Sequence, residues 1–158
     1  MDLPYHTPLS SEQQRQLGID PAQPLAMADQ VRYSQLDVQN HVNNTVYMEW
    51  FERLRIRYLD EIGIQGEAAA RPRIVIRSGT IHWRQEMHAN EDFVATCGCV
   101  RFRNTSMSLV QQIWAGGTLR ATFDCVIVLL TPDGSARFPI PDALRHHLET
   151  VDGAVFDG

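Results

Sequence analysis

The chain has 158 residues, of which 44% are hydrophobic and 21% are charged, and its formal net charge is −5. This length predicts one domain, and the composition is typical of a globular protein rather than a disordered or fibrous one. The acidic balance argues against nucleic acid as a partner. No apolar run approaches the ~20 residues that a membrane-spanning helix needs, so no membrane partner is expected. The N-terminal residues lack the basic start and apolar core of a secretion signal, which favours a cytoplasmic protein.

Residues 1–25 are predicted to form a polar N-terminal extension with one short helix. Ser10 and Gln13 occupy the two positions of a capping box, in which each side chain accepts a hydrogen bond from the backbone amide of the other residue. The main domain is expected to span residues 26–149. Residues 150–158 would then form a C-terminal tail.

The longest predicted helix runs from about residue 44 to residue 62. Its large apolar side chains recur at steps of three and four residues, which places them on one helical face. They are Tyr47, Trp50, Phe51, Leu54, Tyr58 and Ile62. Asn43 can cap the N-terminus by accepting a hydrogen bond from an amide of the first turn, and Gly63 suits a left-handed C-terminal cap. A helix with this stripe should be mostly enclosed by the rest of the domain.

Strands are predicted on both sides of this helix. The first covers residues 27–35, and after residue 71 apolar residues alternate with polar ones, as in a half-buried sheet. Gly116-Gly117 predicts a tight hairpin. A short helix over residues 142–149 completes an α+β domain. The later strands are expected over residues 73–84 (with a kink at Gly79), 93–102, 105–115 and 119–130.

The last of these strands ends in five consecutive apolar residues, 126–130. Such a strand must be covered on both faces, by the long helix on one side and by another group on the other. A second copy of the chain best explains the missing cover. The sequence therefore predicts at least a homodimer.

Three cysteines are present, which is an odd number. Cys97 and Cys99 would share one face of a strand, and Cys125 lies in an apolar run. This arrangement predicts reduced thiols in the core rather than a disulfide or a zinc site. No metal site is expected.

Five polar residues gather just before the long helix: Asp37, Asn40, His41, Asn43 and Asn44. Runs of this kind commonly cap a helix and turn a loop, and that structural interpretation stays open here. The N-terminus of a helix also leaves amides unpaired and carries partial positive charge, so it can bind an oxyanion or a polarised carbonyl. A carboxylate and an imidazole beside that end are groups that move protons or activate water. The cluster is therefore a candidate active site.

The string LDVQNHVNN at residues 36–44, followed by Tyr47 and Glu52, resembles the signature of the hotdog-fold acyl-CoA thioesterases. It is closest to the 4-hydroxybenzoyl-CoA thioesterase type, with similarity to the acyl-acyl-carrier-protein thioesterases, and the resemblance extends over residues 26–148. It implies a hotdog fold, in which a curved antiparallel sheet wraps a long helix. It also implies hydrolysis of an acyl-CoA or acyl-carrier-protein thioester to a free acid and a thiol. Coenzyme A would then be part of the substrate, and no separate cofactor is expected.

The resemblance also implies roles for individual residues. Asp37 aligns with the catalytic acid, which acts as nucleophile or as base for water, and His41 fits a second base or a substrate-orienting group. The backbone amide of Asn44 corresponds to the donor that polarises the thioester carbonyl. The carrier-protein enzymes have the Asn and Gln of this loop in the opposite order, so a mechanism centred on Asp37 is favoured over one centred on the His. The neighbouring residues expected to bind substrate are Asn40, Val42 and Asn43.

Two further pairs are expected to bind substrate. Thr105 and Ser106 resemble a Thr-Ser pair whose hydroxyl, in many relatives, reaches the thioester from the adjacent subunit. Arg101 and Arg103 project from one strand face and are candidates to bind the phosphates of coenzyme A. A pair of strand residues after a turn and a solvated strand edge remain the alternative interpretations. A hydroxyl from a second chain again requires a homodimer or a tetramer.

Two other functions remain open. Enoyl-CoA hydratases on the same fold also pair an Asp with a His a few residues later, as Asp37 and His41 do. A non-catalytic acyl-binding module is the second alternative, because a fold does not guarantee a chemistry. Loss of the conjugated absorbance of crotonyl-CoA would indicate hydration, whereas release of thiol from a saturated acyl-CoA would indicate hydrolysis.

Overall fold

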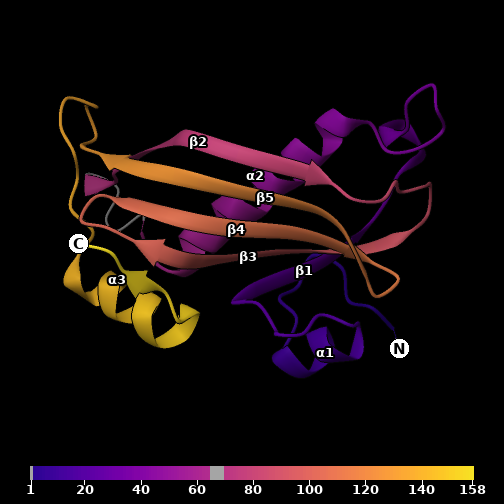
Figure 1. Ribbon diagram of the computed structural model, residues 1–158, viewed down its shortest axis with the longest axis horizontal. Helices are drawn as coiled ribbons and strands as arrows, with labels where there is room; N and C mark the ends of the chain where they lie inside the picture. Colours follow the sequence, from indigo (N-terminus) through magenta and orange to yellow (C-terminus); the bar gives the residue numbers. More distant parts are fainter. Residues whose placement is uncertain (1, 65–69) are drawn as a thin grey trace.

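The computed structural model of the protein describes residues 2–64 and 70–158. Within these ranges a six-stranded sheet forms one layer, and the long helix α2 lies across one of its faces (Figure 1). The helical elements are α1 (Ser11–Gln16), η1 (Tyr33–Gln35), α2 (Asn44–Glu61), α3 (Asp142–His147) and η3 (Leu148–Asp152). The strands are β1 (Leu25–Gln30), β2 (Arg73–Trp83), β3 (Asp92–Phe102), β4 (Ser106–Ala115), β5 (Thr118–Leu130) and β6 (Val155–Phe156). No helix in the described ranges is both long and apolar enough to cross a membrane.

Strands β1 to β5 are antiparallel neighbours in the order β1-β3-β4-β5-β2. Strand β6 pairs in parallel with the end of β3. Helix α2 packs mainly on β3 and β4, and the side chains of all three elements share one hydrophobic core. An antiparallel sheet with a long helix on one face confirms the predicted α+β class and the arrangement expected of a hotdog fold.

Both predicted caps of α2 are confirmed. Asn43 is the N-cap, and its side-chain oxygen accepts a hydrogen bond of 3.0 Å from the amide of Thr45. The helix ends at Glu61, and Gly63 adopts a φ of +78°, the left-handed conformation that favours glycine. The predicted stripe is buried except for Ile62, which is half-buried as the C-cap. The buried residues of α2 are Tyr47, Trp50, Phe51, Leu54, Tyr58 and Leu59.

Aromatic stacking and one buried amide hold α2 against the sheet. The ring of Trp50 stacks on Phe93 of β3 with centroids 4.1 Å apart, and Phe51 stacks on Phe123 of β5 at 5.6 Å. Each such pair stabilises the fold by about 0.5–1.5 kcal/mol beyond its area burial. Gln111 of β4 is fully buried, and its Nε2 donates a 2.7 Å hydrogen bond to the carbonyl oxygen of Phe51. Because this bond is directional, it fixes the position of α2, and hence of its N-terminus, on the sheet.

The predicted first strand, residues 27–35, is wrong in its second half. Strand β1 ends at Gln30, and the chain then enters the 3-10 turn η1. The side chain of Gln35 accepts a 2.8 Å hydrogen bond from the amide of Arg32, which closes the turn. A side chain that bonds local backbone in this way competes with the ladder of a strand.

The predicted kink in β2 lies at a different residue. The register of β2 against β5 shifts between Ile76 and Ser78, so the bulge is at Arg77 rather than at Gly79. A Cβ at Gly79 would lie 2.6 Å from Cε2 of Phe123. The glycine is therefore needed for packing of the Phe123 ring and not for the bend.

The other predicted strands are confirmed, with ends within one residue of those expected. Gly116 and Gly117 join β4 to β5 with φ values of +57° and +73°, which favour glycine in a two-residue hairpin. All three cysteines are buried and free, as predicted. Burial raises the pKa of the Cys97 thiol well above its ordinary value, so this thiol is unreactive at neutral pH.

Both ends of the chain pack on the sheet. The capping box of Ser10 and Gln13 is confirmed, and Tyr5 and Pro8 form bridges to β1 that cover its outer edge. At the other end, the predicted helix over residues 142–149 is shorter than expected. After α3 the α-helix changes into the wider π-helical turn η3. The chain then continues into β6, which pairs with β3 at the edge of the sheet.

A buried carboxylate fixes this C-terminal segment. The side chain of Asp152 is fully buried, and its Oδ2 accepts hydrogen bonds from the hydroxyl of Tyr58 and from the amide of Cys99. Residues 150–158, predicted as a tail, are therefore tied to α2 and to β3. Removal of either donor would leave a buried charge short of partners, which is costly.

The edge strand β2 has no pairing partner on its outer side among the described residues. Its apolar side chains Val75, Ile76 and Trp83 are 37%, 44% and 45% exposed. In contrast, Val128 in the apolar end of β5 is only 4% exposed within the single chain. The chain covers Val128 itself, whereas Val126 and Leu130 on the same face of β5 are half-buried. The partner subunit expected to cover this end of β5 therefore stays a prediction, and β2 exposes further apolar side chains.

Candidate active site

The loop before α2 is a tight turn that folds back on itself. The amide of Asp37 donates a 3.0 Å hydrogen bond to the carbonyl oxygen of His41, and the amide of Asn40 donates one of 3.0 Å to the carbonyl oxygen of Asp37. Asn40 has a φ of +64°, in the left-handed region that asparagine tolerates better than most residues. The Oδ1 atom of Asp37 accepts a 2.8 Å hydrogen bond from the amide of Gln39. This turn carries His41 to the start of α2.

Three backbone amides near the start of α2 are candidates to bind a carbonyl oxygen, and the structure distinguishes them. The amide of Val42 donates to the carbonyl oxygen of Met87 at 2.8 Å, and the amide of Asn43 donates to that of Gln35 at 3.0 Å. Both amides are occupied, so Val42 and Asn43 shape the loop. The amide of Asn44 makes no hydrogen bond within the described residues. It is the free donor at the N-terminus of α2.

A cavity of about 180 Å³ lies beside this free amide. The start of α2 and the segment that follows β2 form its walls. Because Trp83 belongs to the edge strand β2, the cavity lies at the free edge of the sheet. The lining residues that matter here are His41, Asn44, Tyr47, Trp83, Arg84 and Glu86.

His41 faces Glu86 at this cavity. The Nε2 atom of His41 lies 3.8 Å from Oε2 of Glu86, and the other oxygen of the same carboxylate lies 3.6 Å from Nε2 of His88. The side chain of His41 is 29% exposed, so solvent and substrate can both reach it. A carboxylate at this position can orient the imidazole for proton transfer.

Arg120 of β5 holds the segment that carries Glu86. It is buried, and its Nη1 donates a 2.8 Å hydrogen bond to the carbonyl oxygen of Glu86, while its Nη2 pairs with the Glu91 carboxylate at 3.0 Å. In return, the carbonyl oxygen of Arg120 accepts hydrogen bonds from the amides of Arg84 and Gln85. One buried guanidinium therefore determines where the acidic wall of the cavity lies.

Tyr47 also lines this cavity. Burial raises the pKa of Tyr47 to about 12, although the positive charge of Arg120 acts in the opposite direction. The hydroxyl therefore stays protonated at neutral pH and can donate a hydrogen bond. Its ring meets Trp50 edge-on, with centroids 5.3 Å apart, which fixes the ring in the wall.

Asp37 lies on the adjoining turn and does not line this cavity. Its side chain is half-buried, with Oδ1 bonded to the Gln39 amide. The Oδ2 atom makes no hydrogen bond with any part of the chain that the structure describes, so it can bind a water. Within one chain, His41 and Asn44 both line the cavity. Asp37 lies outside it, on the turn that precedes His41.

Thr105 and Ser106 lie at the other end of the sheet. Ser106 pairs with Val128 of β5, whereas Trp83 in the cavity wall pairs with Ala121 of the same strand. Val128 and Ala121 are seven residues apart, which corresponds to about 23 Å along a strand. The hydroxyls of Thr105 and Ser106 therefore cannot reach the cavity of their own chain.

Arg101 and Arg103 lie at that same end, where Arg77 of β2 joins them around a pocket of about 230 Å³. The hydroxyl-bearing Ser106 also lines it. Near the C-terminus, Oδ2 of Asp157 lies 3.4 Å from Nη1 of Arg101 and 3.4 Å from Nη2 of Arg103. The three arginines make this pocket a candidate to bind an anion, and the Asp157 carboxylate partly neutralises their charge.

Sequence reasoning missed Glu86 and Arg84 in the cavity wall, Arg120 behind them, and Arg77 in the anion pocket. Glu86 follows β2, far along the chain from His41, and only the folding of β2 beside α2 brings the two together. An acidic residue soon after a predicted strand is the only signal, and it is weak. Among residues 2–64 and 70–158, no group of His, Cys, Asp and Glu side chains is arranged to hold a metal ion.

Comparison with known proteins identifies relatives of the chain. Residues 31–148 match the family model described as the thioesterase-like superfamily. The chain is similar to the crystal structure of a thioesterase superfamily protein from Jannaschia sp. CCS1, with 36% identity and a TM-score of 0.89 over 96% of this chain and 97% of that one. It is also similar to a predicted thioesterase from Bacillus stearothermophilus, with 26% identity and a TM-score of 0.69 over 80% of this chain and 94% of that one. No curated protein matches the sequence.

A more distant likeness links the chain to a thioesterase from Thermus thermophilus complexed with coenzyme A and Zn. The identity is 24% and the TM-score is 0.72, over 84% of this chain and 97% of that one, and at this identity the likeness supports the fold alone. The family match covers most of the chain, including the turn at Asp37, helix α2 and the sheet as far as β5. The chain therefore belongs to the thioesterase-like superfamily.

Proposed function

We propose that the protein is an acyl-CoA thioesterase, which hydrolyses its substrate to a free acid and the thiol of coenzyme A. The observation that carries this proposal is the cavity at the N-terminus of α2, where the unpaired Asn44 amide, His41 and Glu86 meet. Membership of the thioesterase-like superfamily supports the reaction class. We take a CoA ester rather than a carrier-protein ester as the substrate because Arg77, Arg101 and Arg103 line a second pocket that could bind the phosphates of coenzyme A.

In the proposed mechanism, the carbonyl oxygen of the thioester accepts a hydrogen bond from the Asn44 amide. The partial positive charge of the helix N-terminus stabilises the negative charge that develops there. A water held by the free oxygen of Asp37 attacks the carbonyl carbon and loses its proton to that carboxylate. The C–S bond then breaks, and the protonated form of His41, oriented by Glu86, gives its proton to the departing thiolate. The proton taken up by Asp37 returns to His41 through solvent, which restores both groups. Asp37 and Asn44 keep the roles that the likeness to 4-hydroxybenzoyl-CoA thioesterases implies. His41, expected from the sequence to be a second base or a substrate-orienting group, is given the role of an acid instead.

We further propose that the active unit is a homodimer joined through β2. The outer edge of β2 has no partner strand among the described residues, so its backbone donors and acceptors are free to pair. The same strand exposes the apolar side chains of Val75, Ile76 and Trp83. In a two-fold antiparallel pairing, the Arg73 end of one β2 lies opposite the Trp83 end of the other. This pairing carries the partner subunit's Ser106 towards the cavity that a chain's own Ser106 cannot reach.

The anion pocket at the far end of the sheet is the proposed site for the phosphates of coenzyme A. Arg77, Arg101 and Arg103 line it, and guanidinium groups bind phosphate with charge-assisted hydrogen bonds. The Asp157 carboxylate lies 3.4 Å from both Arg101 and Arg103. A bound phosphate would displace this carboxylate from the two arginines. Asn40 is exposed on the turn just before His41. We therefore keep it as a residue that contacts the substrate.

Release of thiol from short-chain, long-chain and aryl CoA esters, and from an acyl-carrier-protein ester, tests the function. We expect turnover of at least one CoA ester by the wild-type protein. The Asp37→Asn variant should lose ~10²–10³ in rate with its fold intact, because that is the typical cost of removing a general base. The matched control is Asp60→Asn, an exposed carboxylate at the other end of α2. Hydrolysis at the wild-type rate by Asp37→Asn would show that the assignment of Asp37 is wrong.

The same panel separates the alternative functions. Loss of the conjugated absorbance of crotonyl-CoA without release of thiol would indicate a hydratase. Saturable binding of CoA esters with no turnover of any of them would indicate an acyl-binding module.

A further inference from the structure

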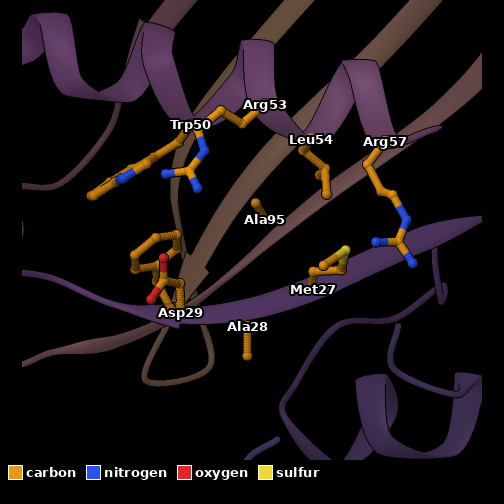
Figure 2. Close-up of a pocket in the computed structure, with 9 residues that line it drawn as sticks. Met27, Ala28, Asp29, Trp50, Arg53, Leu54, Arg57 and Ala95 are labelled. Atoms are coloured by element: carbon orange, nitrogen blue, oxygen red, sulfur yellow. The ribbon is translucent and has the colours of Figure 1, made fainter. Parts of the chain in front are cut away.

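A second cavity lies beside the middle of α2, apart from the one at its N-terminus. It has a volume of about 160 Å³ and lies between α2 and β1 (Figure 2). Cavities of roughly this size hold a benzene-sized molecule. We name it the α2–β1 groove, and the residues that define it are Met27, Trp50, Arg53, Leu54, Arg57 and Phe93. The proposed hydrolysis makes no use of it.

The floor of the α2–β1 groove is apolar and rigid. Trp50 and Phe93 are both buried and stack with their centroids 4.1 Å apart, and the buried side chains of Leu54 and Ala95 continue the floor. Figure 2 shows Trp50 and Leu54 directed from α2 towards β1, with Met27 rising from β1 to meet them. Met27 is partly exposed and flexible, so it can adapt to the shape of an apolar ligand.

Two arginines stand over this floor. Arg53 and Arg57 are one helical turn apart, and Figure 2 shows both guanidinium groups directed from α2 towards β1. Arg57 uses Nε for a 2.8 Å hydrogen bond to Glu61, and Arg53 approaches Glu49 only at 3.9 Å. Each guanidinium has about five N–H donors, so most of them remain free for a ligand.

One carboxylate, that of Asp29, also lines the α2–β1 groove, and its contacts are with groups outside the groove. The Oδ1 atom of Asp29 accepts a 2.8 Å hydrogen bond from the amide of Gln30, and it lies 3.5 Å from His6 and 3.8 Å from Arg32. Within the described residues, Asp29 makes no ion pair with Arg53 or Arg57. The groove therefore presents positive charge directly above an apolar floor.

We propose that the α2–β1 groove binds an amphipathic monocarboxylate. The short alkyl or aryl body lies on the floor of Trp50, Leu54 and Phe93, and the carboxylate binds the guanidinium groups of Arg53 and Arg57. Burial of the apolar body drives binding, and the planar guanidinium groups match the geometry of a carboxylate. A free acid of this class is what thioester hydrolysis releases. Binding in the groove does not depend on hydrolysis, and it is tested without it.

Calorimetric titration of the full chain with octanoate, below its micellar concentration, is the primary test. Octan-1-ol, which has the same eight-carbon chain but no charge, serves as the control ligand. We expect one octanoate per chain, and we expect Arg53→Gln/Arg57→Gln to weaken octanoate binding by about tenfold or more while it leaves octan-1-ol unchanged. The matched control is Arg15→Gln/Arg137→Gln, which removes two exposed arginines outside the groove and should keep the wild-type affinity.

A second pair of variants tests the β1 side of the groove. Met27→Glu places a carboxylate opposite the two arginines and should abolish octanoate binding, whereas Met27→Leu should retain it. Thermal unfolding of each variant checks that the fold is intact. Three results would overturn the proposal: no binding of octanoate by the wild-type chain, equal affinity in the wild-type chain and Arg53→Gln/Arg57→Gln, or an equal loss in both double variants.

Discussion

The two ends of the sheet carry different chemistry. At the Trp83 end, His41, Glu86 and the free Asn44 amide surround a cavity suited to activating a thioester. At the Ser106 end, three arginines surround a hollow suited to an anion. The two ends are about 23 Å apart along β5. This separation teaches that the groups gathered at the two ends cannot act on one small substrate within a single chain, and the proposed homodimer would bring them together.

The two ends also differ in how the fold supports them. The cavity end depends on Arg120, a buried side chain near the start of β5 that bonds the segment around Glu86. The anion end depends on the last residues of the chain, because Asp152 anchors η3 and Asp157 pairs with Arg101 and Arg103. The candidate active site is thus fixed by a buried side chain, whereas the arginines of the other pocket pair with an exposed residue near the C-terminus.

The largest expected effect lies at the cavity end. His41→Gln should lower kcat by about 10²–10³, because it removes the group that protonates the leaving thiolate. His88→Gln is the control, since His88 contacts the same Glu86 carboxylate but does not line the cavity. Steady-state hydrolysis of the best CoA ester measures both. An unchanged kcat in His41→Gln would remove His41 from the mechanism.

Mixed dimers test whether the two ends meet across subunits. His41→Gln and Thr105→Ala/Ser106→Ala should each be nearly inactive alone. After unfolding and joint refolding in equal amounts, about a quarter of wild-type activity should return, because half of the dimers are mixed and each of these has one intact site. Failure of the mixture to exceed the mean of its two parents would refute a site shared between subunits.

A smaller effect is expected from the anion end. Arg101→Gln/Arg103→Gln should raise KM for a CoA ester by about tenfold with little change in kcat, because two charge-assisted hydrogen bonds to phosphate are lost. The matched substrate is an N-acetylcysteamine thioester with the same acyl group, which lacks the nucleotide and should show no change. A similar rise in KM for both substrates would place the arginines outside phosphate binding.

The smallest effect is expected from Asp157. Asp157→Asn should lower KM for a CoA ester by about twofold, because it removes an exposed carboxylate that competes with phosphate for the two arginines. The decrease should fade at high ionic strength, since exposed charges are screened by salt. Measurement of KM at low and high salt tests this, and an increase in KM would mean that Asp157 positions the arginines instead.

Local sequence signals account for most of the fold. Helix α2 was predictable because its apolar period, its Asn43 cap and its Gly63 stop all lie within the helix or next to it. The hairpin at Gly116-Gly117 follows from backbone conformations that glycine favours. The predictions that were wrong concern positions where contacts with distant segments, rather than the neighbouring sequence, decide the conformation. The bulge in β2 lies at Arg77, and Gly79 is there for a ring that β5 supplies.

The sequence by itself determined that a polar turn leads into a buried helix, and that Asp37, His41 and Asn44 therefore lie near one another. Only the tertiary structure decided which amide is free, because the acceptor for the Val42 amide, Met87, lies far along the chain and the acceptor for the Asn43 amide, Gln35, depends on how the preceding turn folds. It also decided that the carboxylate facing His41 is Glu86. The physical reason is the distance along the chain over which each interaction acts. Apolar periodicity and helix caps act over a few residues, whereas the cavity is formed by segments that meet only when the chain folds.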